Sequence, residues 1–321
     1  MAFAQGDSGS SDPELELVVR EILQLDPTGD AFAAVYRETF DQLYDGQRTG
    51  RYRWADLYKT EKTHYGTLIE INLQRKFNFK DGVVLDYQIA DVEVDCKYSF
   101  RDGGWMLPPE SWGQLVIVSS ANDESSTWSL GVVRVSDENR RLTVNRDGKS
   151  TLSPVGRLAI RWIFRLSSFP PNVLLQLSPQ QIEEVFAAKR GQSRVDALFR
   201  VATERRIHRN TVATVAQQHD YMKRVRSNGG SRSNLRDEGI LILGGDYKSH
   251  RELAENFAVP VPWPGELVSF RVVPTTHDDA IGVELDGAYW RKATASDVVS
   301  RPAPLLPRPS TLRRLETLDE F

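Results

Sequence analysis

The sequence predicts an α/β protein of two domains, a mixed-sheet domain followed by a helix-turn-helix domain with strands of its own. A chain of 321 residues is long enough for two cores of ordinary size. Strand-like apolar runs gather between residues 83 and 135, after segments with helical spacing. The second half begins after Pro170-Pro171 and is marked by short helical segments and a basic stretch. These observations predict one architecture for each half.

Helices are expected at the start of the first domain. Residues 14–24 and 31–44 have apolar residues at helical spacing, and the Asp26-Pro27-Thr28-Gly29-Asp30 segment between them has the composition of a turn. A third helix is expected over about residues 63–76. Asp81-Gly82 then predicts a turn into the sheet.

Four apolar runs predict the strands of the first domain. They are residues 83–89, 92–98, 115–118 and 130–135. Ser153-Pro154 predicts a helix that reaches about Phe164, because serine caps helices and proline suits the first helical position. Helices, strands and a final helix together indicate a mixed α/β sheet domain over residues 1–166.

The second half has the pattern of a helix-turn-helix domain. Residues 167–176 are the expected linker, since the Pro170-Pro171 pair stiffens an extended connection. Helices are expected to start at Ser178-Pro179, at Ser193 and after Asn210, and the short segment 205–209 gives the last two a helix-turn-helix spacing. Strands at 239–244 and 267–273 would serve as a wing. We therefore assign residues 177–321 to a second domain.

Charge is distributed unevenly along the chain. The formal net charge is −3, yet residues 187–236 hold 12 Lys and Arg against 3 Asp and Glu. Such a basic block is expected of a surface that contacts nucleic acid, because cations paired with phosphates release condensed counterions. A solvated, charged helix face is an equally good interpretation of the charge pattern alone.

Composition excludes several classes of protein. No apolar run is long enough to span a bilayer, and the first residues lack the basic start and apolar stretch of a secretory signal. The single cysteine, Cys96, excludes an intramolecular disulfide framework and a multi-cysteine zinc site. The expected location is the cytoplasm.

Asp86, Asp95 and Lys97 form the constellation that could carry chemistry. Side chains alternate along a strand, so Asp95 and Lys97 share one face. Asp86 lies on the preceding predicted strand and can approach Asp95 across the pair, and Glu70 on the preceding helix could complete the site. Clustered carboxylates that hold magnesium, beside a group that positions water, suit phosphodiester hydrolysis. The motif alone is weakly specific, and the alternative interpretation is a solvated face of a strand and a helix.

Beyond this constellation, the chain resembles the NaeI family of type IIE restriction endonucleases. The segments that carry the resemblance in the first half are Asp41-Gln42-Leu43-Tyr44-Asp45-Gly46-Gln47-Arg48-Thr49-Gly50-Arg51, Lys59-Thr60-Glu61-Lys62-Thr63-His64, Gly66-Thr67-Leu68, Glu70-Ile71-Asn72-Leu73, Val94-Asp95-Cys96-Lys97 and Trp105-Met106-Leu107-Pro108-Pro109-Glu110-Ser111. Those in the second half are Thr214-Val215-Ala216-Gln217-Gln218 and Met222-Lys223-Arg224-Val225-Arg226. The resemblance covers most of the chain.

The resemblance implies a nuclease core of the PD-(D/E)xK, restriction-endonuclease-like type. Glu70, Asp86 and Asp95 fall where such enzymes hold Mg2+, and Lys97 falls where they keep the lysine that orients or activates water. The backbone carbonyl of Cys96, rather than its thiol, is the expected further metal ligand. The family's proline before the first aspartate is absent, since Leu85 precedes Asp86.

For the second domain the resemblance implies a winged-helix module that binds an additional copy of the recognition sequence and stimulates cleavage. The helix after Asn210 is the presumed recognition helix, with Val212, Val215 and Met222 facing the core. The expected DNA-binding residues are Thr211, Thr214, Gln217, Gln218, Lys223, Arg224, Arg226 and Arg232. Glutamine suits adenine, and the arginines are expected to hold phosphates.

The implied activity is magnesium-dependent, sequence-specific cleavage of double-stranded DNA by a homodimer, leaving 5′-phosphate and 3′-hydroxyl ends. The resemblance suggests a GC-rich palindrome such as GCCGGC, and a companion DNA methyltransferase that protects the host. Two alternatives stay open. One is a DNA-repair nickase on the same core, and the other is a winged-helix regulator whose nuclease half is degenerate.

Overall fold

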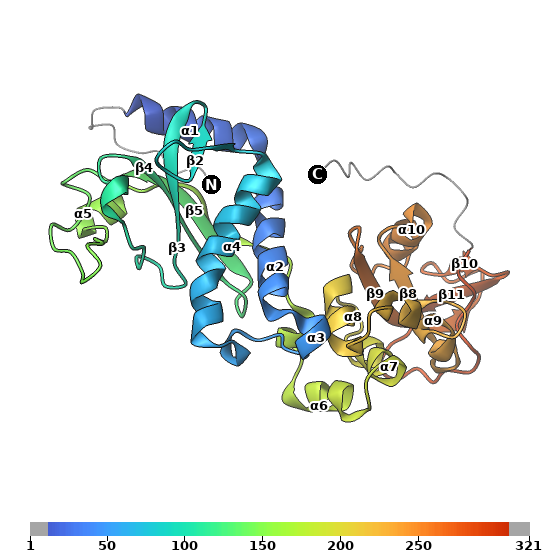
Figure 1. The fold of residues 1–321 in the computed structure, drawn as a ribbon. Coiled ribbons are helices and arrows are strands. Elements are labelled where there is room, and N and C mark those ends of the chain that lie inside the picture. The colour runs from blue at the N-terminus through green and yellow to red at the C-terminus, as the bar shows by residue number, and fades with distance from the viewer. Residues whose placement is uncertain (1–11, 308–321) are drawn as a thin grey trace. The chain divides into compact units, whose positions relative to one another are not determined.

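A computed structural model describes residues 12–307 of the chain, which form two compact units (Figure 1). Unit 1 holds the described residues up to Leu43 together with Arg53–Pro171. Unit 2 holds Tyr44–Tyr52 together with the described residues from Asn172 onward. None of the helices described between residues 12 and 307 is long and apolar enough to cross a membrane.

The division between the units lies within the expected linker, between Pro171 and Asn172. Neither end of that linker is free of structure. Ser167 and Ser168 end a strand of unit 1, and Val173 and Leu174 are buried in the core of unit 2. Residues 44–52, which the sequence assigned to the first domain, cluster with unit 2.

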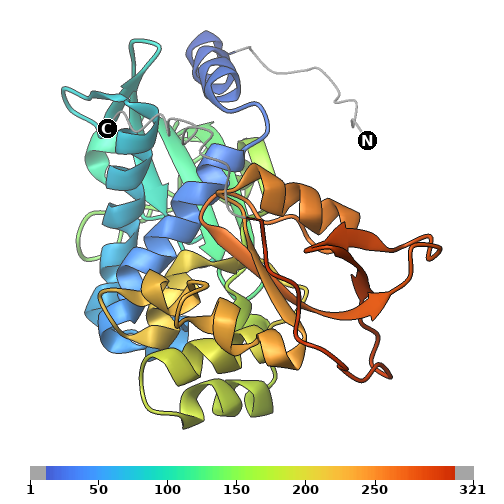
Figure 2. The ribbon, with the colours of Figure 1, turned by 90° about the vertical axis from the view of Figure 1, so that its right-hand side faces the viewer.

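Three helices of unit 1 agree with the sequence prediction: α1 (Pro13–Leu25), α2 (Asp30–Tyr44) and α4 (Lys59–Phe77). The buried carboxylate of Asp26 accepts hydrogen bonds from the backbone N–H groups of Gly29 and Phe32, 3.0 Å each, and so shapes the turn into α2. A 3-10 turn, η1 (Trp54–Asp56), precedes α4. α2 and α4 run side by side (Figures 1 and 2), joined by a hydrogen bond from Asn72 to Thr39.

A six-stranded mixed sheet forms the centre of unit 1, with its strands in chain order. They are β1 (Lys80–Asp81), β2 (Tyr87–Ile89), β3 (Val92–Tyr98), β4 (Leu115–Asn122), β5 (Thr127–Arg134) and β6 (Arg161–Ser168). β3 and β4 pair in parallel and the other neighbours pair antiparallel. Between β3 and β4 lies a 3-10 turn, η2 (Pro109–Ser111). The mixed α/β class predicted for this half is confirmed.

Two predictions about the first half are wrong in part. The expected strand 83–89 is a strand only over Tyr87–Ile89, because Val83 and Val84 are exposed in a loop and pair with no strand. The expected helix 153–164 ends early, as α5 (Pro154–Leu158), although Ser153 caps it as predicted. Pairing with β5 draws the residues from Arg161 onward into β6, so tertiary structure overrides the local signal there.

The two faces of the sheet are covered differently. Trp128 of β5 packs against Phe32 and Tyr36 of α2, with ring centroids 6.0 and 5.2 Å apart. Since strand side chains alternate, Val116 and Val118 of β4 face the other side, where Trp105 belongs to the same buried cluster. α4 packs against β3, which brings the helix that bears Glu70 to the strand that bears Asp95 and Lys97.

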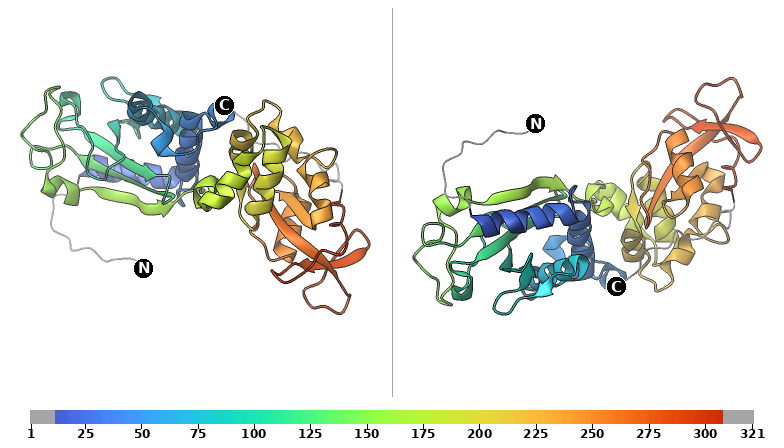
Figure 3. Two further views of the ribbon diagram at one scale, coloured as in Figure 1. Left: turned by 90° about the horizontal axis from the view of Figure 1, so that it is seen from below. Right: turned by 90° about the horizontal axis from the view of Figure 1, so that it is seen from above.

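Unit 2 contains short helices and a second sheet. The helical elements are α3 (Gly46–Thr49), η3 (Val173–Gln176), α6 (Pro179–Ala187), α7 (Gln192–Val201), α8 (Arg209–Ala216), η4 (Tyr221–Val225), α9 (Ser231–Asn234), η5 (Arg236–Glu238) and α10 (Lys248–Asn256). The strands are β7 (Ile207–His208), β8 (Ile240–Gly244), β9 (Glu266–Thr275), β10 (Val283–Leu285) and β11 (Ala288–Lys292). β7, β8 and β11 all pair with β9, and β10 pairs with β11. Figure 3 shows this sheet (orange to red) to one side of helices α6 to α8.

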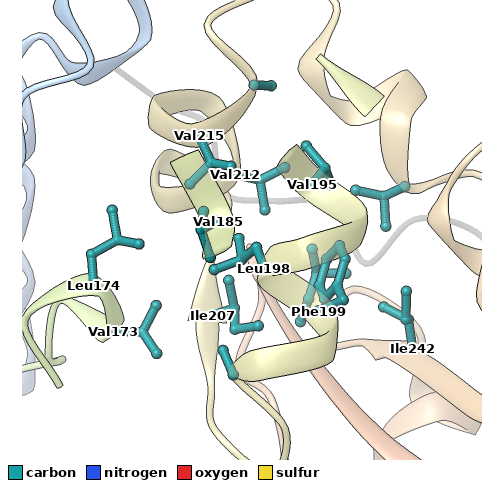
Figure 4. Close-up of a cluster of buried hydrophobic side chains, with 14 of the residues drawn as sticks. Val173, Leu174, Val185, Val195, Leu198, Phe199, Ile207, Val212, Val215 and Ile242 are labelled. Carbon is teal, nitrogen blue, oxygen red and sulfur yellow. The ribbon is translucent and has the colours of Figure 1, made fainter. Parts of the chain in front are cut away.

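The apolar core of unit 2 joins its helices to the sheet (Figure 4). Leu198 and Phe199 of α7 are fully buried beside Val212 and Val215 of α8, and Ile242 of β8 closes the cluster. The predicted core positions Val212 and Val215 are therefore confirmed. Met222 is wrong as a core residue, since it is 38% exposed on η4.

Candidate active site

A tight hairpin aligns the two aspartates of the predicted site. β2 and β3 are joined at Ala90 and Asp91, which both adopt positive φ (51° and 60°) as a two-residue hairpin turn requires. Asp95 and Lys97 lie on β3, and Asp86 immediately precedes β2. Asp86 thus comes from the loop at the start of the strand rather than from the strand itself.

Three oxygen atoms converge on the ammonium group of Lys97. Its Nζ lies 2.5 Å from Asp95 Oδ1, 3.3 Å from Asp86 Oδ2 and 3.1 Å from the carbonyl oxygen of Cys96. The backbone N–H of Cys96 also donates to Asp86 Oδ2, at 2.7 Å. The arrangement therefore contains one position at which two carboxylates and a carbonyl all face a cation.

Burial and proximity perturb the titration of these groups. Burial, followed by the hydrogen bond with Asp86, raises the pKa of Asp95 to about 7. Burial also acts to raise the pKa of Asp86, but hydrogen bonds from Asp95, Cys96 N–H and Lys97 outweigh it, and that pKa lies below its usual value. Burial acts to lower the pKa of Lys97, but the charge and hydrogen bond of Asp95 together with the charge of Asp86 outweigh it, and that pKa lies above its usual value. Two carboxylates this close favour a bound cation.

Asp95 also has an oxygen that the protein leaves without a partner. Its Oδ2 is buried and accepts no hydrogen bond, which is costly for a carboxylate unless another group binds it. Oxygen donors of this kind suit a hard divalent cation. Within residues 12–307, no three His, Cys, Asp or Glu side chains are grouped closely enough to form a metal site by themselves, so a cation here would rely on Asp86, Asp95 and the Cys96 carbonyl.

Glu70 reaches the same region from α4. The hydroxyl of Tyr87, a buried residue of β2, donates to the carbonyl oxygen of Glu70 at 2.6 Å and ties the helix to the hairpin. Burial and then the negative charge of Asp86 raise the pKa of the Glu70 carboxyl. The carboxylates of Glu70 and Asp86 are therefore close enough to repel one another.

The thiol of Cys96 takes no part in this site. It alternates with Asp95 and Lys97 along β3 and is buried, and burial raises its pKa well above the usual value. The carbonyl oxygen of Cys96, the expected further metal ligand, lies 3.1 Å from Lys97 Nζ, and its role as a ligand stays a prediction.

The expected DNA-binding residues of unit 2 are not all on its surface. α8 ends at Ala216, where Gln217 adopts positive φ (49°), and Thr211 and Thr214 are only 7% and 8% exposed. The prediction that these two threonines face outward is wrong. Helix α3 packs against α8, and its Gly46 lies against the Thr214 hydroxyl without room for a side chain, which accounts for the burial of Thr214.

Gln217 and Gln218 are half-buried and engaged within unit 2. Gln217 Oε1 accepts from Arg194 at 3.0 Å, and the carbonyl of Gln218 accepts from the side chain of Gln47 at 2.9 Å. Among the expected cations, Lys223 and Arg226 are exposed, whereas Arg224 is half-buried beside Asp220. Arg232 is half-buried and donates through Nε to the carbonyl of Ile242, at 2.9 Å.

Two residues that support the site were missed in the sequence. Glu93 occupies the same face of β3 as Asp95 and Lys97, two and four residues away, so strand alternation was the signal that could have found it. Tyr87 carries no such signal, because its bond to the Glu70 carbonyl depends on how α4 packs.

Comparison with known proteins gives concordant matches. The sequence model of the family described as "Restriction endonuclease NaeI" matches residues 16–301. The type II restriction enzyme NaeI of Lentzea aerocolonigenes is 45% identical over 307 residues, covering 93% of this chain and 96% of that relative.

Proposed function

The chain belongs to the NaeI family of restriction endonucleases, type II site-specific deoxyribonucleases, and from this premise we propose that unit 1 hydrolyses duplex DNA with magnesium. Asp86, Asp95 and the Cys96 carbonyl would hold the cation, with Glu70 beside them. When bound, magnesium would stabilise the negative charge that develops on the scissile phosphate. The observation that carries the proposal is the convergence of three oxygens on one cation position.

In the proposed reaction water attacks the scissile phosphate in line with the leaving 3′ oxygen. Lys97 Nζ, once released from the carboxylates, would hold the attacking water close to the phosphate. As the water oxygen bonds to phosphorus and gives up a proton to solvent, the bond from phosphorus to the 3′ oxygen breaks and that oxygen takes a proton from solvent, which leaves 5′-phosphate and 3′-hydroxyl ends. Asp95, buried on β3, would hold the cation beside the phosphate.

The test is cleavage of a plasmid of known sequence, with Asp95→Ala and Lys97→Ala as comparisons. Discrete fragments whose ends map to one palindrome, lost in both variants, support the proposal. Nicks in one strand near lesions would indicate a repair nickase instead. An intact plasmid that the protein still retards in a gel would indicate a DNA-binding regulator.

For unit 2 we propose a winged-helix module that binds DNA. Its order is helix, strand, helix, helical segment and two strands with a helix between them (α7, β7, α8, residues 221–235, β8, α10 and β9), and β7 and β8 both pair with β9. We take α8 and the 221–235 segment, in place of the α7–α8 pair expected from the sequence, as the helix-turn-helix, and in such a motif the second helix enters the major groove. Exposed Lys223 and Arg226 on this segment support that choice, and buried Thr211 and Thr214 argue against α8.

We further propose that the DNA bound by unit 2 is a second copy of the recognition sequence, which stimulates cleavage of the first. The enzyme would act as a homodimer, because two symmetric sites suit the two strands of a palindrome. A GC-rich palindrome such as GCCGGC, a protecting methyltransferase and a cytoplasmic location complete the proposal. Faster cleavage of a one-site plasmid when a short cognate duplex is added, but not a scrambled duplex, is the expected result.

A further inference from the structure

Glu93 binds a loop rather than a cation. Its carboxylate accepts hydrogen bonds from three successive backbone N–H groups, those of Val83 (2.8 Å), Val84 (3.1 Å) and Leu85 (3.0 Å). A fourth bond comes from the side chain of Gln88, its partner in the β2–β3 register, at 2.9 Å. Three consecutive backbone N–H groups that point toward one carboxylate form an anion-binding nest, and here the bound anion is the Glu93 side chain.

The loop that Glu93 holds is otherwise weakly packed. The side chains of Val83 and Val84 are 84% and 70% exposed, so of these three residues only Leu85, which is 9% exposed, is buried. Gly82 is close to the carbonyl of Leu85, and a methyl group at position 82 would collide with that carbonyl and approach Glu93 Oε2 to 3.1 Å. The exposed residues Val83 and Val84 are therefore held by backbone hydrogen bonds to a single side chain, and Leu85 adds one buried apolar residue.

This loop ends at Asp86. The carboxylate of Asp86 accepts a hydrogen bond from the backbone N–H of Cys96. In the chain Asp86 directly follows Leu85, the last of the three residues whose N–H groups Glu93 binds. Glu93, Asp95 and Lys97 share one face of β3. One strand therefore supplies two residues of the site and also the side chain that holds the loop before Asp86.

We propose that Glu93 is a positioning residue of the nuclease site, which orders residues 82–86 so that Asp86 is already in place to receive a divalent cation. The inference rests on the magnesium-dependent nuclease proposed above. Without the carboxylate, three amides lose their acceptor and the loop must be ordered when the cation binds. Partners that orient metal ligands usually contribute 10- to 100-fold to metal affinity, so about a 10-fold loss is expected.

The test compares Glu93→Ala, Glu93→Gln and a matched control, Asp91→Asn, in the full-length protein. Asp91 lies on the same hairpin and its neutralisation changes the charge equally, but its carboxylate pairs with Lys80 in an exposed ion pair and does not contact the loop. Three quantities are measured: the Mg2+ concentration for half-maximal plasmid cleavage, the affinity for Mn2+ from its electron paramagnetic resonance signal without DNA, and the melting temperature.

With Glu93→Ala we expect both metal affinities to fall about 10-fold, while the cleavage rate at saturating Mg2+ stays within about threefold of wild type. Glu93→Gln should be intermediate, because one amide oxygen can accept from only part of the nest. Asp91→Asn should match wild type. This pattern separates positioning from a general loss of structure, which would lower the melting temperature and the saturated rate together.

Unchanged metal affinity in both Glu93 variants would overturn the inference, even if Glu93→Ala melts lower. A wild-type protein that never cleaves DNA with Mg2+ would overturn the proposed function instead. The Mn2+ titration keeps these outcomes apart, because it reads the carboxylates without requiring catalysis.

Discussion

His250 should make unit 2 sensitive to mild acid. It is 3% exposed on α10, and its Nδ1 accepts a hydrogen bond from the backbone N–H of Gly244 at 3.1 Å. Burial, and then the positive charge of Arg232, lower its pKa to about 4 from 6.5. A proton on Nδ1 would also abolish the bond to Gly244, so the folded state holds this histidine neutral.

The expected loss of stability follows from that shift. Between pH 6.5 and 4 the unfolded chain binds a proton that the folded chain does not, so stability falls as the pH decreases through this window. From the direction and size of this pKa shift, the free energy of unfolding of unit 2 should fall by about 2 kcal/mol between pH 7.5 and pH 5. Above pH 7 the contribution of His250 to the stability of unit 2 is fully present and constant.

The assay is unfolding in urea at the two pH values, followed by hydrogen exchange of peptides that cover β8 and α10. His250→Asn is the matched variant, because its amide oxygen can still accept from Gly244 N–H but does not titrate. On acidification, the free energy of unfolding of the wild-type protein should fall by about 2 kcal/mol more than that of this variant. Equal losses in the two proteins would refute the reasoning, since other groups would then account for the pH dependence.

Three further predictions concern the site and the two units. Asp95→Asn should reduce cleavage at least about 100-fold while metal-free gel shifts stay within a few-fold of wild type; full cleavage would remove Asp95 from the site. The double variant Lys223→Ala, Arg226→Ala should weaken binding of an isolated duplex and lower the slope of log affinity against log salt by about 2, whereas an unchanged slope would show that residues 221–235 touch no phosphate. Gly46→Val should destabilise unit 2 by about 1–3 kcal/mol in urea unfolding, because a side chain there meets Thr214 of α8; a neutral effect would mean that α3 can lift away.

Much of the fold could be predicted because its signals are local. Helical spacing located α1, α2 and α4, and the serine caps at Ser153 and Ser178 started their helices as expected. The lengths of β2 and α5 could not be predicted, because they depend on which partner strand is adjacent. The same limit applies to the burial of Thr214, which lies against Gly46, a residue more than 150 positions away in sequence.

By itself, the sequence determined the family and the class of enzyme, and it predicted that Asp95 and Lys97 share a face, since spacing along a strand sets which side chains lie on the same side. Only the tertiary structure decided that Glu93 holds the loop before Asp86, that Tyr87 ties α4 to the hairpin, and that α3 covers α8. These are contacts between backbone groups and distant side chains. Sequence periodicity does not encode them, because any residue supplies the same N–H and carbonyl groups.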